Sequence, residues 1–315
     1  MSTRFAANAF RRTMVWNIRN QKHNIYRIAK HNKFLSSNHA PSALPQIVME
    51  RISPDDSDGD EPSSKTITKV TLHRPKANAM GRQMISELNH CLDVLETSTP
   101  SDCRCVVFTS FSQRVFSAGA DLKERSAMSE DETRVFVGLL RSTMQRVADL
   151  PFPVVAAIDG VALGGGLELA LAADLRIASE KAKLGFPETS LAILPGAGGT
   201  QRLPRLIGSA KAKELVWTGN QLSGRQALDC GLVNEVVATG SATDRATELA
   251  FEIASNGPVA IRASKAAIQK GAGLECIHEA LEIERKCYSR VIPTRDRLEG
   301  LKAFREGRTP KYTGE

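Results

Sequence analysis

The feature that most constrains the fold of this chain is a run of three glycines, Gly164 to Gly166, between two apolar segments. The segment before it, Pro153 to Ile158, is apolar and partly β-branched, which predicts a buried strand. The segment after it is rich in Leu and Ala, which have high helix propensity. The predicted order is strand, glycine turn and helix, which leaves bare backbone N–H groups at the positive end of a helix.

Glu168 lies three residues after Gly165 and belongs to the same face of the predicted helix. A carboxylate beside a turn that can stabilise an oxyanion indicates a catalytic site. The alternative is that the glycines only permit tight helix–strand packing and that Glu168 caps the helix or faces solvent. A phosphate-binding loop is disfavoured, because neither Gly-Lys-Ser/Thr nor a complete Gly-x-Gly-x-x-Gly pattern is present.

The formal net charge of +7 belongs to the N-terminal segment rather than to the whole chain. Residues 1–49 carry eight Lys and Arg and no acidic residue, and the rest has 34 basic against 35 acidic residues. We therefore expect no nucleic-acid binding by the body of the protein. A basic segment that includes apolar residues such as Phe5 and Trp16 predicts a mitochondrial transit peptide over residues 1–45. The alternative is a disordered basic arm that contacts nucleic acid or acidic lipid.

Predicted strands and helices alternate through the first two-thirds of the chain, and helical patterns dominate its end. This order predicts an α/β core over residues 46–250 and a C-terminal helical region over 251–315. The six cysteines have no Cys-x-x-Cys spacing and no His at metal-ligand spacing, so we expect reduced thiols and no metal. No uninterrupted apolar run reaches about 18 residues, so we expect no membrane span.

Three further segments indicate parts of a site. Residues 116–124 are mostly small and follow a predicted strand, although alone they are consistent with an ordinary turn. Glu188 follows a proline in a short apolar context, and residues 195–203 form a glycine-rich turn that begins a helix. Two small-residue loops with two carboxylates together predict a site that polarises a carbonyl group between two backbone N–H groups.

These motifs resemble the enoyl-CoA hydratase/isomerase (crotonase) family over essentially the whole chain after about residue 47, and most of all its mitochondrial methylglutaconyl-CoA hydratase type. The matching segments are 116–124, 162–168, 187–188, 195–203 and 292–304. The resemblance implies an α/β crotonase fold, which is a spiral of ββα units with a C-terminal helical trimerisation region. It also implies a homo-trimer or hexamer.

The resemblance implies roles for individual residues. The backbone N–H groups of Ala120 and Gly165 would form an oxyanion hole for the thioester carbonyl, and Glu168 and Glu188 would hold water and share proton transfer. The residues implied to bind the CoA substrate are Ala118, Gly119, Asp121, Leu122, Lys123 and Lys76. No cofactor and no metal would be needed, because the CoA thioester is itself the substrate.

Two positions depart from the family pattern. Family members often have Lys where this chain has Gly307, so Arg305 or Arg308 would have to supply that cation to CoA. The RNA-binding member of the methylglutaconyl type has a row of lysines on the helix that matches residues 81–95. Here that helix has Arg82 together with acidic residues, so RNA binding is not supported.

The expected function is hydration of 2-enoyl-CoA thioesters to 3-hydroxyacyl-CoA in fatty acid β-oxidation in the mitochondrial matrix. The family's isomerases generally lack the glutamate that matches Glu168, so the presence of both glutamates favours hydration over a double-bond shift. One alternative is hydration of 3-methylglutaconyl-CoA in leucine degradation, which would require a cation that the sequence alone does not locate. An alternative of another class is an RNA-binding protein on the same fold.

Overall fold

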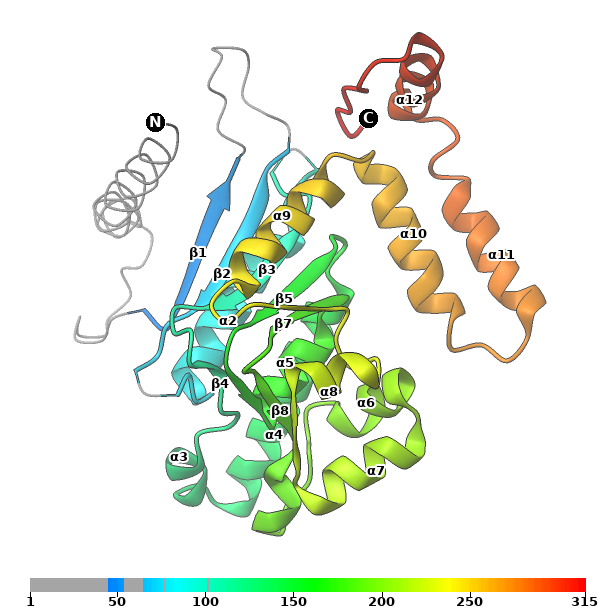
Figure 1. Cartoon of the computed structure of the whole chain (residues 1–315). Helices are drawn as coiled ribbons and strands as arrows, with labels where there is room; N and C mark the ends of the chain where they lie inside the picture. Colours follow the sequence, from blue (N-terminus) through cyan, green and yellow to red (C-terminus); the bar gives the residue numbers. More distant parts are fainter. Residues whose placement is uncertain (1–44, 54–64, 76, 101) are drawn as a thin grey trace, which may run out of the picture. The chain divides into compact units, whose positions relative to one another are not determined.

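The computed structural model describes residues 45–53, 65–75, 77–100 and 102–315 (Figure 1). The predicted transit peptide, apart from its last residue, and the predicted contact residue Lys76 lie outside the described residues.

The larger sheet has the strand order β1-β2-β3-β5-β7-β10. Its strands are β1 (Ile47–Ile52), β2 (Ile67–Leu72), β3 (Val106–Ser110), β5 (Val154–Ile158), β7 (Leu175–Ser179) and β10 (Glu235–Val237). β1 pairs with β2 in antiparallel orientation, and the other neighbours are parallel. Leu232 and Val233 are buried in the turn that precedes the last strand, β10.

Helices cover both faces of this sheet, as the alternation of side chains along its strands requires. Val106 and Phe108 of β3 belong to the same hydrophobic cluster as α2 (Arg82–Glu96) and α4 (Glu130–Asp149), and Val107 belongs to a second cluster with α9 (Ala242–Ala254). The buried residues of α9 are alanines spaced four apart, which lets this helix lie close to the sheet (Figure 1).

A smaller sheet has the order β4-β6-β8-β9, with β4 (Val115–Ser117), β6 (Val161–Leu163), β8 (Lys183–Gly185) and β9 (Gln221–Ser223). It corrects the prediction of a single strand before the three glycines. After β5 the chain turns at Asp159 and Gly160 and forms β6, and the glycines follow β6. Gly160 is required at the turn, because a Cβ there would collide with the Arg114 carbonyl group.

The order strand, strand, helix recurs along the chain, as the resemblance implies. β3 and β4 lead to α3 (Leu122–Ser126), β5 and β6 lead to α5 (Gly165–Ala172), and β7 and β8 lead to the 3₁₀ helix η1 (Pro187–Leu191). β4, β6 and β8 are consecutive and parallel in the smaller sheet, so the segments that follow them leave the same edge. Three helices complete the core: α6 (Gly199–Ile207), α7 (Ser209–Thr218) and α8 (Gly224–Asp229).

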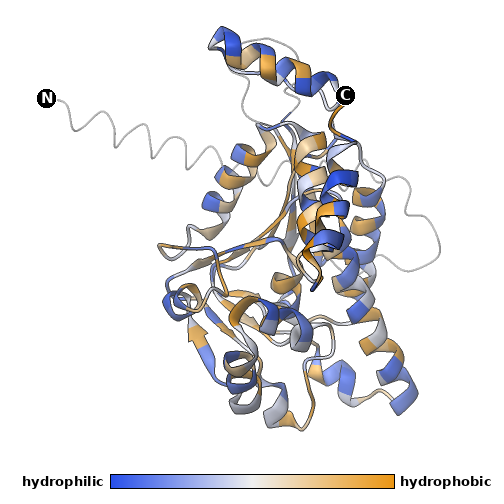
Figure 2. Ribbon diagram, turned by 90° about the vertical axis from the view of Figure 1, so that its right-hand side faces the viewer, coloured by the Kyte–Doolittle hydropathy of each residue, from blue (hydrophilic) through white to orange (hydrophobic). Residues whose placement is uncertain are grey.

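The predicted helical region contains α10 (Pro258–Gly271), α11 (Ile277–Tyr288) and α12 (Arg295–Glu306). Lys265 of α10 ties this helix to the core by donating to the Asp174 carboxylate and the Phe152 carbonyl group, each at 2.8 Å. Apolar residues recur among hydrophilic ones along the helix at the C-terminus (Figure 2). All six cysteines are free thiols, as expected, and no helix of the described residues is long and apolar enough to cross a membrane.

Candidate active site

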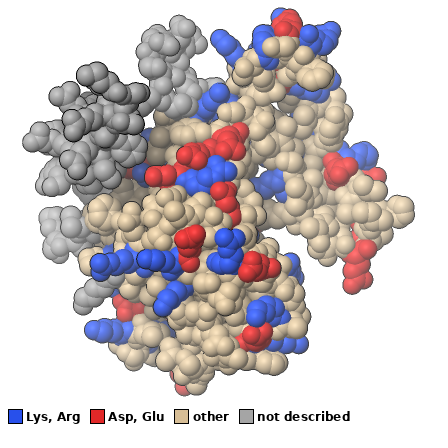
Figure 3. Space-filling model, viewed as in Figure 1, with Lys and Arg blue, Asp and Glu red and all other residues tan. Residues whose placement is uncertain are grey.

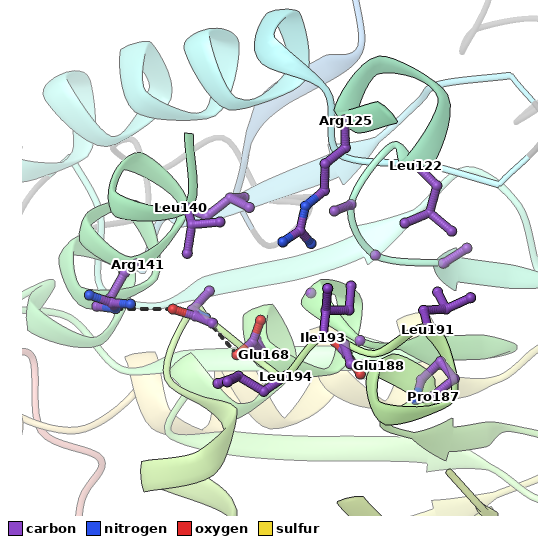
Figure 4. A pocket seen from close by; sticks show the side chains of 18 of the residues that line it. Leu122, Arg125, Leu140, Arg141, Glu168, Pro187, Glu188, Leu191, Ile193 and Leu194 are labelled. Atoms are coloured by element: carbon purple, nitrogen blue, oxygen red, sulfur yellow. Dashed lines mark hydrogen bonds between the residues drawn. The ribbon is translucent and has the colours of Figure 1, made fainter. Parts of the chain in front are cut away.

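A cavity of about 440 Å³ lies where the loops after β4 and β6 meet η1 and the loop before α6 (Figure 4). Apolar side chains form much of its wall, among them Leu140 of α4 and Leu194. Glu168 and Glu188 are both in the lining, although they come from different elements. A mostly apolar cavity with a few convergent polar groups is the usual form of a small-molecule site.

The loop after β4 is held by the turn that follows β2. Arg74 forms an ion pair with Asp121 at 2.5 Å, and Asn78 donates to the Phe116 carbonyl group at 2.9 Å. Ser117 Oγ donates in turn to the Asn78 carbonyl group at 2.8 Å. These contacts fix the backbone of the loop, and none of the described residues of the turn lines the cavity.

The Ala120 N–H group points away from the turn. In the isolated parallel bridge between Met80 and Ala120, the Met80 N–H donates to Gly119 and the Asp121 N–H donates to Met80. The Ala120 N–H therefore has no backbone acceptor among the described residues. Ala120 lines the cavity, so this donor is available to a bound oxygen atom.

The Gly165 N–H is a second donor at the same place, because Gly165 is the first residue of α5 and such N–H groups have no partner within the helix. An ideal Cβ on Gly165 would lie 3.5 Å from the Ala120 nitrogen, so the two loops are in close contact. Gly119 makes that approach possible. Its φ is +90°, and a Cβ there would lie 2.8 Å from the Leu163 carbonyl oxygen.

Glu168 lies on α5 with its side chain buried, which corrects the alternative of a solvated residue. The Ala197 and Gly199 N–H groups donate to its Oε1 atom at 2.7 and 2.8 Å. These donors come from the glycine-rich segment 195–203, so that segment orients the carboxylate. Burial raises the pKa of Glu168, whereas the two hydrogen bonds and the charges of Arg202 and Arg141 oppose that rise.

Glu188 lies on η1 and is also buried. Its Oε2 atom is buried without a hydrogen-bond partner among the described residues. Burial raises the pKa of Glu188 to about 7, the negative charge of Glu168 adds to the rise, and Arg125 opposes it. A carboxyl group with this pKa can both release and accept a proton near neutral pH.

The cavity brings most of the predicted site residues together. Those that line it are Ala118, Gly119, Ala120, Leu122, Gly165, Glu168 and Glu188. Asp121 and Lys123 are not in the lining. The Asp121 side chain instead accepts from the Lys123 and Glu124 N–H groups at the start of α3. Lys123 is exposed beside the loop.

Two arginines of the cavity were not predicted. Arg125 of α3 extends toward its centre in Figure 4 and makes no ion pair with another described residue. Arg141 of α4 lines the cavity and donates to the Gly196 carbonyl group at 3.0 Å. Both lie in helices with exposed polar residues, where a charged side chain is usually only solvated, so the sequence contains no signal that separates them from surface charges.

The two departures from the family pattern have structural explanations. Gly307 ends α12 in the left-handed conformation, with φ +65°, which favours glycine over lysine. Arg308 pairs with Glu299 through both of its Nη atoms, at 2.6 and 2.9 Å, so it is already neutralised. On α2, Arg82 pairs with Glu132 at 3.0 Å rather than extending a basic row.

Comparisons with known proteins agree with this geometry. The sequence model of the family described as enoyl-CoA hydratase/isomerase matches residues 62–315. The human mitochondrial enoyl-CoA hydratase domain-containing protein 2 is 51% identical over 79% of this chain and 86% of its own length. Human mitochondrial methylglutaconyl-CoA hydratase is 46% identical over 76% of this chain and 70% of its own length. The crystal structure of an enoyl-CoA hydratase from Bacillus anthracis has a TM-score of 0.79 at 46% identity and covers 86% of this chain and all of that chain. These matches confirm the crotonase fold.

Proposed function

The chain belongs to the enoyl-CoA hydratase/isomerase family and is a hydro-lyase, and on that premise we propose that it adds water across the 2,3-double bond of 2-enoyl-CoA thioesters. One observation carries this proposal. Glu168 and Glu188 are both buried in one cavity with the Ala120 and Gly165 N–H groups. This is the set of groups that addition of water to a conjugated thioester requires.

In the proposed reaction the thioester oxygen accepts hydrogen bonds from Ala120 and Gly165. Negative charge collects on that oxygen as water attacks C3, so fixed donors stabilise the enolate-like transition state more than the substrate. The two carboxyl groups hold the water, one taking its proton and the other delivering a proton to C2. They act as a coupled pair, and we assign no order between Glu168 and Glu188. No cofactor or metal takes part in this proposal.

We propose straight-chain 2-enoyl-CoA of fatty acid β-oxidation as the substrate and the mitochondrial matrix as the location. The apolar part of the cavity lining, which includes Leu122, Val137, Leu140 and Leu194, supports an aliphatic acyl chain. Support for the location comes from the basic, acid-free N-terminal segment and from relatives whose names include the word mitochondrial.

Arg125 favours a second candidate, which is an acyl group with a distal carboxylate such as 3-methylglutaconyl. Its guanidinium lies at the cavity and can bind a carboxylate through two hydrogen bonds. The relative named methylglutaconyl-CoA hydratase supports the same candidate. This arginine is the cation that such a substrate requires.

The experiment compares kcat/KM of the full chain and of Arg125→Met on crotonyl-CoA, a long-chain 2-enoyl-CoA and 3-methylglutaconyl-CoA. If straight-chain substrates lead and Arg125→Met changes them by less than about threefold, the β-oxidation proposal stands. If methylglutaconyl-CoA leads by about a hundredfold and Arg125→Met removes about 30-fold or more of that lead, the second candidate replaces it, since a charged hydrogen bond contributes about 1.5–3 kcal/mol. No hydration of any of the three would refute the proposed function.

The alternative of an RNA-binding protein has little support. Figure 3 shows Lys and Arg interspersed with Asp and Glu on the visible face, rather than a field of one sign. A filter-binding titration with RNA at low and physiological salt tests this alternative. An RNA affinity that falls steeply with salt would favour the RNA-binding alternative, and absence of binding at both salt concentrations would exclude it.

A further inference from the structure

The backbone between Gly196 and Gly199 connects Glu168 to two arginines. Arg141 Nε donates to the Gly196 carbonyl oxygen at 3.0 Å, and the Ala197 N–H donates to Glu168 Oε1 at 2.7 Å. The Gly196 carbonyl and the Ala197 N–H belong to the same peptide group. A cation at the oxygen of that peptide polarises its N–H, which strengthens the hydrogen bond to the carboxylate.

Arg202 holds the next peptide group of the same segment. Its Nη1 atom donates to the Ala197 carbonyl oxygen at 3.2 Å, and its Nη2 atom donates to Gln145 of α4 at 2.8 Å. Gln145 donates in turn to the Asp149 carboxylate at 3.0 Å. The guanidinium is also packed against the segment, since a Cβ on Gly198 would collide with it. Arg202 therefore links the 196–199 segment to α4.

We propose that Arg141 and Arg202 are positioning residues that clamp the 196–199 segment by its carbonyl groups and thereby set the position and the charge state of the Glu168 carboxylate. Neither arginine is a catalytic residue in this proposal, because each acts through the peptide groups that contact Glu168. The clamp joins α4 and α6 to α5, so a shift of either α4 or α6 would displace the Glu168 carboxylate. This inference rests on the proposed function only where it concerns turnover.

The charges around Glu168 give the proposal a measurable sign. Arg202 and Arg141 oppose the rise of its pKa, and the acid that interacts with it is Glu188, whose own pKa is raised by the charge of Glu168 and lowered by that of Arg125. Removing Arg202 or Arg141 removes a positive charge and stabilises the protonated form. The limb of the kcat–pH profile that depends on this carboxyl group then shifts to higher pH, whether Glu168 is the base or the acid of the pair.

The test uses Arg141→Met and Arg202→Met, which remove the charge and the donors while keeping an unbranched apolar stem. The conservative variants Arg141→Lys and Arg202→Lys keep the charge. Arg134→Met is the matched control, because Arg134 lies on α4 and, among the described residues, forms an ion pair only with exposed Asp131. Circular dichroism and a thermal melt establish that each variant is folded.

With crotonyl-CoA we expect kcat of the methionine variants to fall about tenfold or more with KM changed less than about threefold, because small misplacements of a catalytic group are costly. We expect the apparent pKa of that limb of the kcat–pH profile to rise by about half a unit or more in the methionine variants. In the lysine variants we expect it to return to the wild-type value. The control should match the wild type. A fall in kcat with an unmoved limb, or limbs that the lysine variants do not restore, would overturn the proposal in favour of a merely structural role.

A second readout does not depend on turnover. A ¹³C NMR titration follows the Glu168 carboxyl signal, which Glu168→Gln identifies by its disappearance. We expect its midpoint to rise in both methionine variants and to stay in place in Arg134→Met. If the wild type does not hydrate crotonyl-CoA, the proposed function fails while this titration still decides the clamp. An unchanged midpoint would refute the clamp even in an active enzyme.

Discussion

At the scale of single residues, the surroundings of the Glu188 carboxyl group suit proton transfer but lower the stability of the folded protein. Its carboxyl group is buried, its Oε2 atom has no partner among the described residues, and its pKa is raised to about 7 from the usual 4.5. A carboxyl group whose pKa is raised in the folded state binds its proton more tightly there than in the unfolded chain. Folding stability is therefore lost as the pH rises from about 4.5 through about 7.

This sign predicts that Glu188→Gln is more stable than the wild type above pH 7, because glutamine cannot ionise. The gain at pH 8 should be on the order of 1–3 kcal/mol, and it should vanish as the pH approaches 4.5. Urea unfolding of both proteins between pH 4.5 and 8 measures the difference. A difference that stays constant across this range, or that grows toward acid, would contradict the raised pKa.

The family resemblance implies both glutamates and the N–H groups of Ala120 and Gly165 as site residues, and the structure places all four residues in the lining of one cavity. The partners of Glu168 could not be predicted from the sequence, since Ala197 and Gly199 meet it only after α5 and α6 pack together. Arg125 and Arg141 were also beyond prediction. Their role depends on which way a helix face points, and that is decided by tertiary packing.

At the scale of elements, the site depends on close contact between the loops after β4 and β6. Gly119 lies at that contact with φ +90°, where a side chain would strain the backbone and press on the Leu163 carbonyl oxygen and the Gly165 nitrogen. The lengths of these strands explain why the second sheet was not predicted. β4, β6 and β8 have three residues each, which is too short for an alternating pattern to be visible in a sequence.

Gly119→Ala should therefore separate the two donors and lower kcat on crotonyl-CoA by about 10²-fold, which is the typical loss when one oxyanion donor is removed. Gly138→Ala is the control. Gly138 lies within α4 with nothing within 4 Å of its would-be Cβ, so alanine should leave kcat unchanged and stabilise the helix by about 0.5–1 kcal/mol. Equal kcat for Gly119→Ala and the wild type would show that the loop contact does not position the donors.

At the scale of the whole molecule, the C-terminal helices expose large apolar side chains. Leu281, Tyr288, Leu298, Leu301 and Phe304 are all at least 48% exposed, and Phe304 reaches 87%. Exposed apolar surface of this extent indicates a protein–protein contact. We propose that a second copy of the chain covers it, which is consistent with the trimer or hexamer that the resemblance implies. The sequence predicts the helices here, but only the structure shows which of their apolar side chains are left exposed by the other described residues.

Leu301→Glu combined with Phe304→Glu should convert the assembled protein into monomers, because each carboxylate would have to be buried without a partner. Light scattering coupled to size-exclusion chromatography measures the mass against the 34.2 kDa of one chain. Lys302→Glu, which changes an exposed neighbour on the same helix, is the control and should remain assembled. A wild type that is monomeric would contradict the proposed contact.

Two buried carboxyl groups beside two backbone donors are proposed to hydrate an enoyl thioester, and the rate of that hydration can be followed by absorbance. The loss of the ultraviolet absorbance of the conjugated thioester of crotonyl-CoA is followed with the wild type, Glu168→Gln and Glu188→Gln. We predict rapid hydration by the wild type and a loss of about 10³-fold or more in kcat in each variant, with crotonyl-CoA still bound, since general acid–base groups typically contribute about 10²–10⁴-fold. Wild-type turnover in a folded Glu188→Gln variant would contradict the claim.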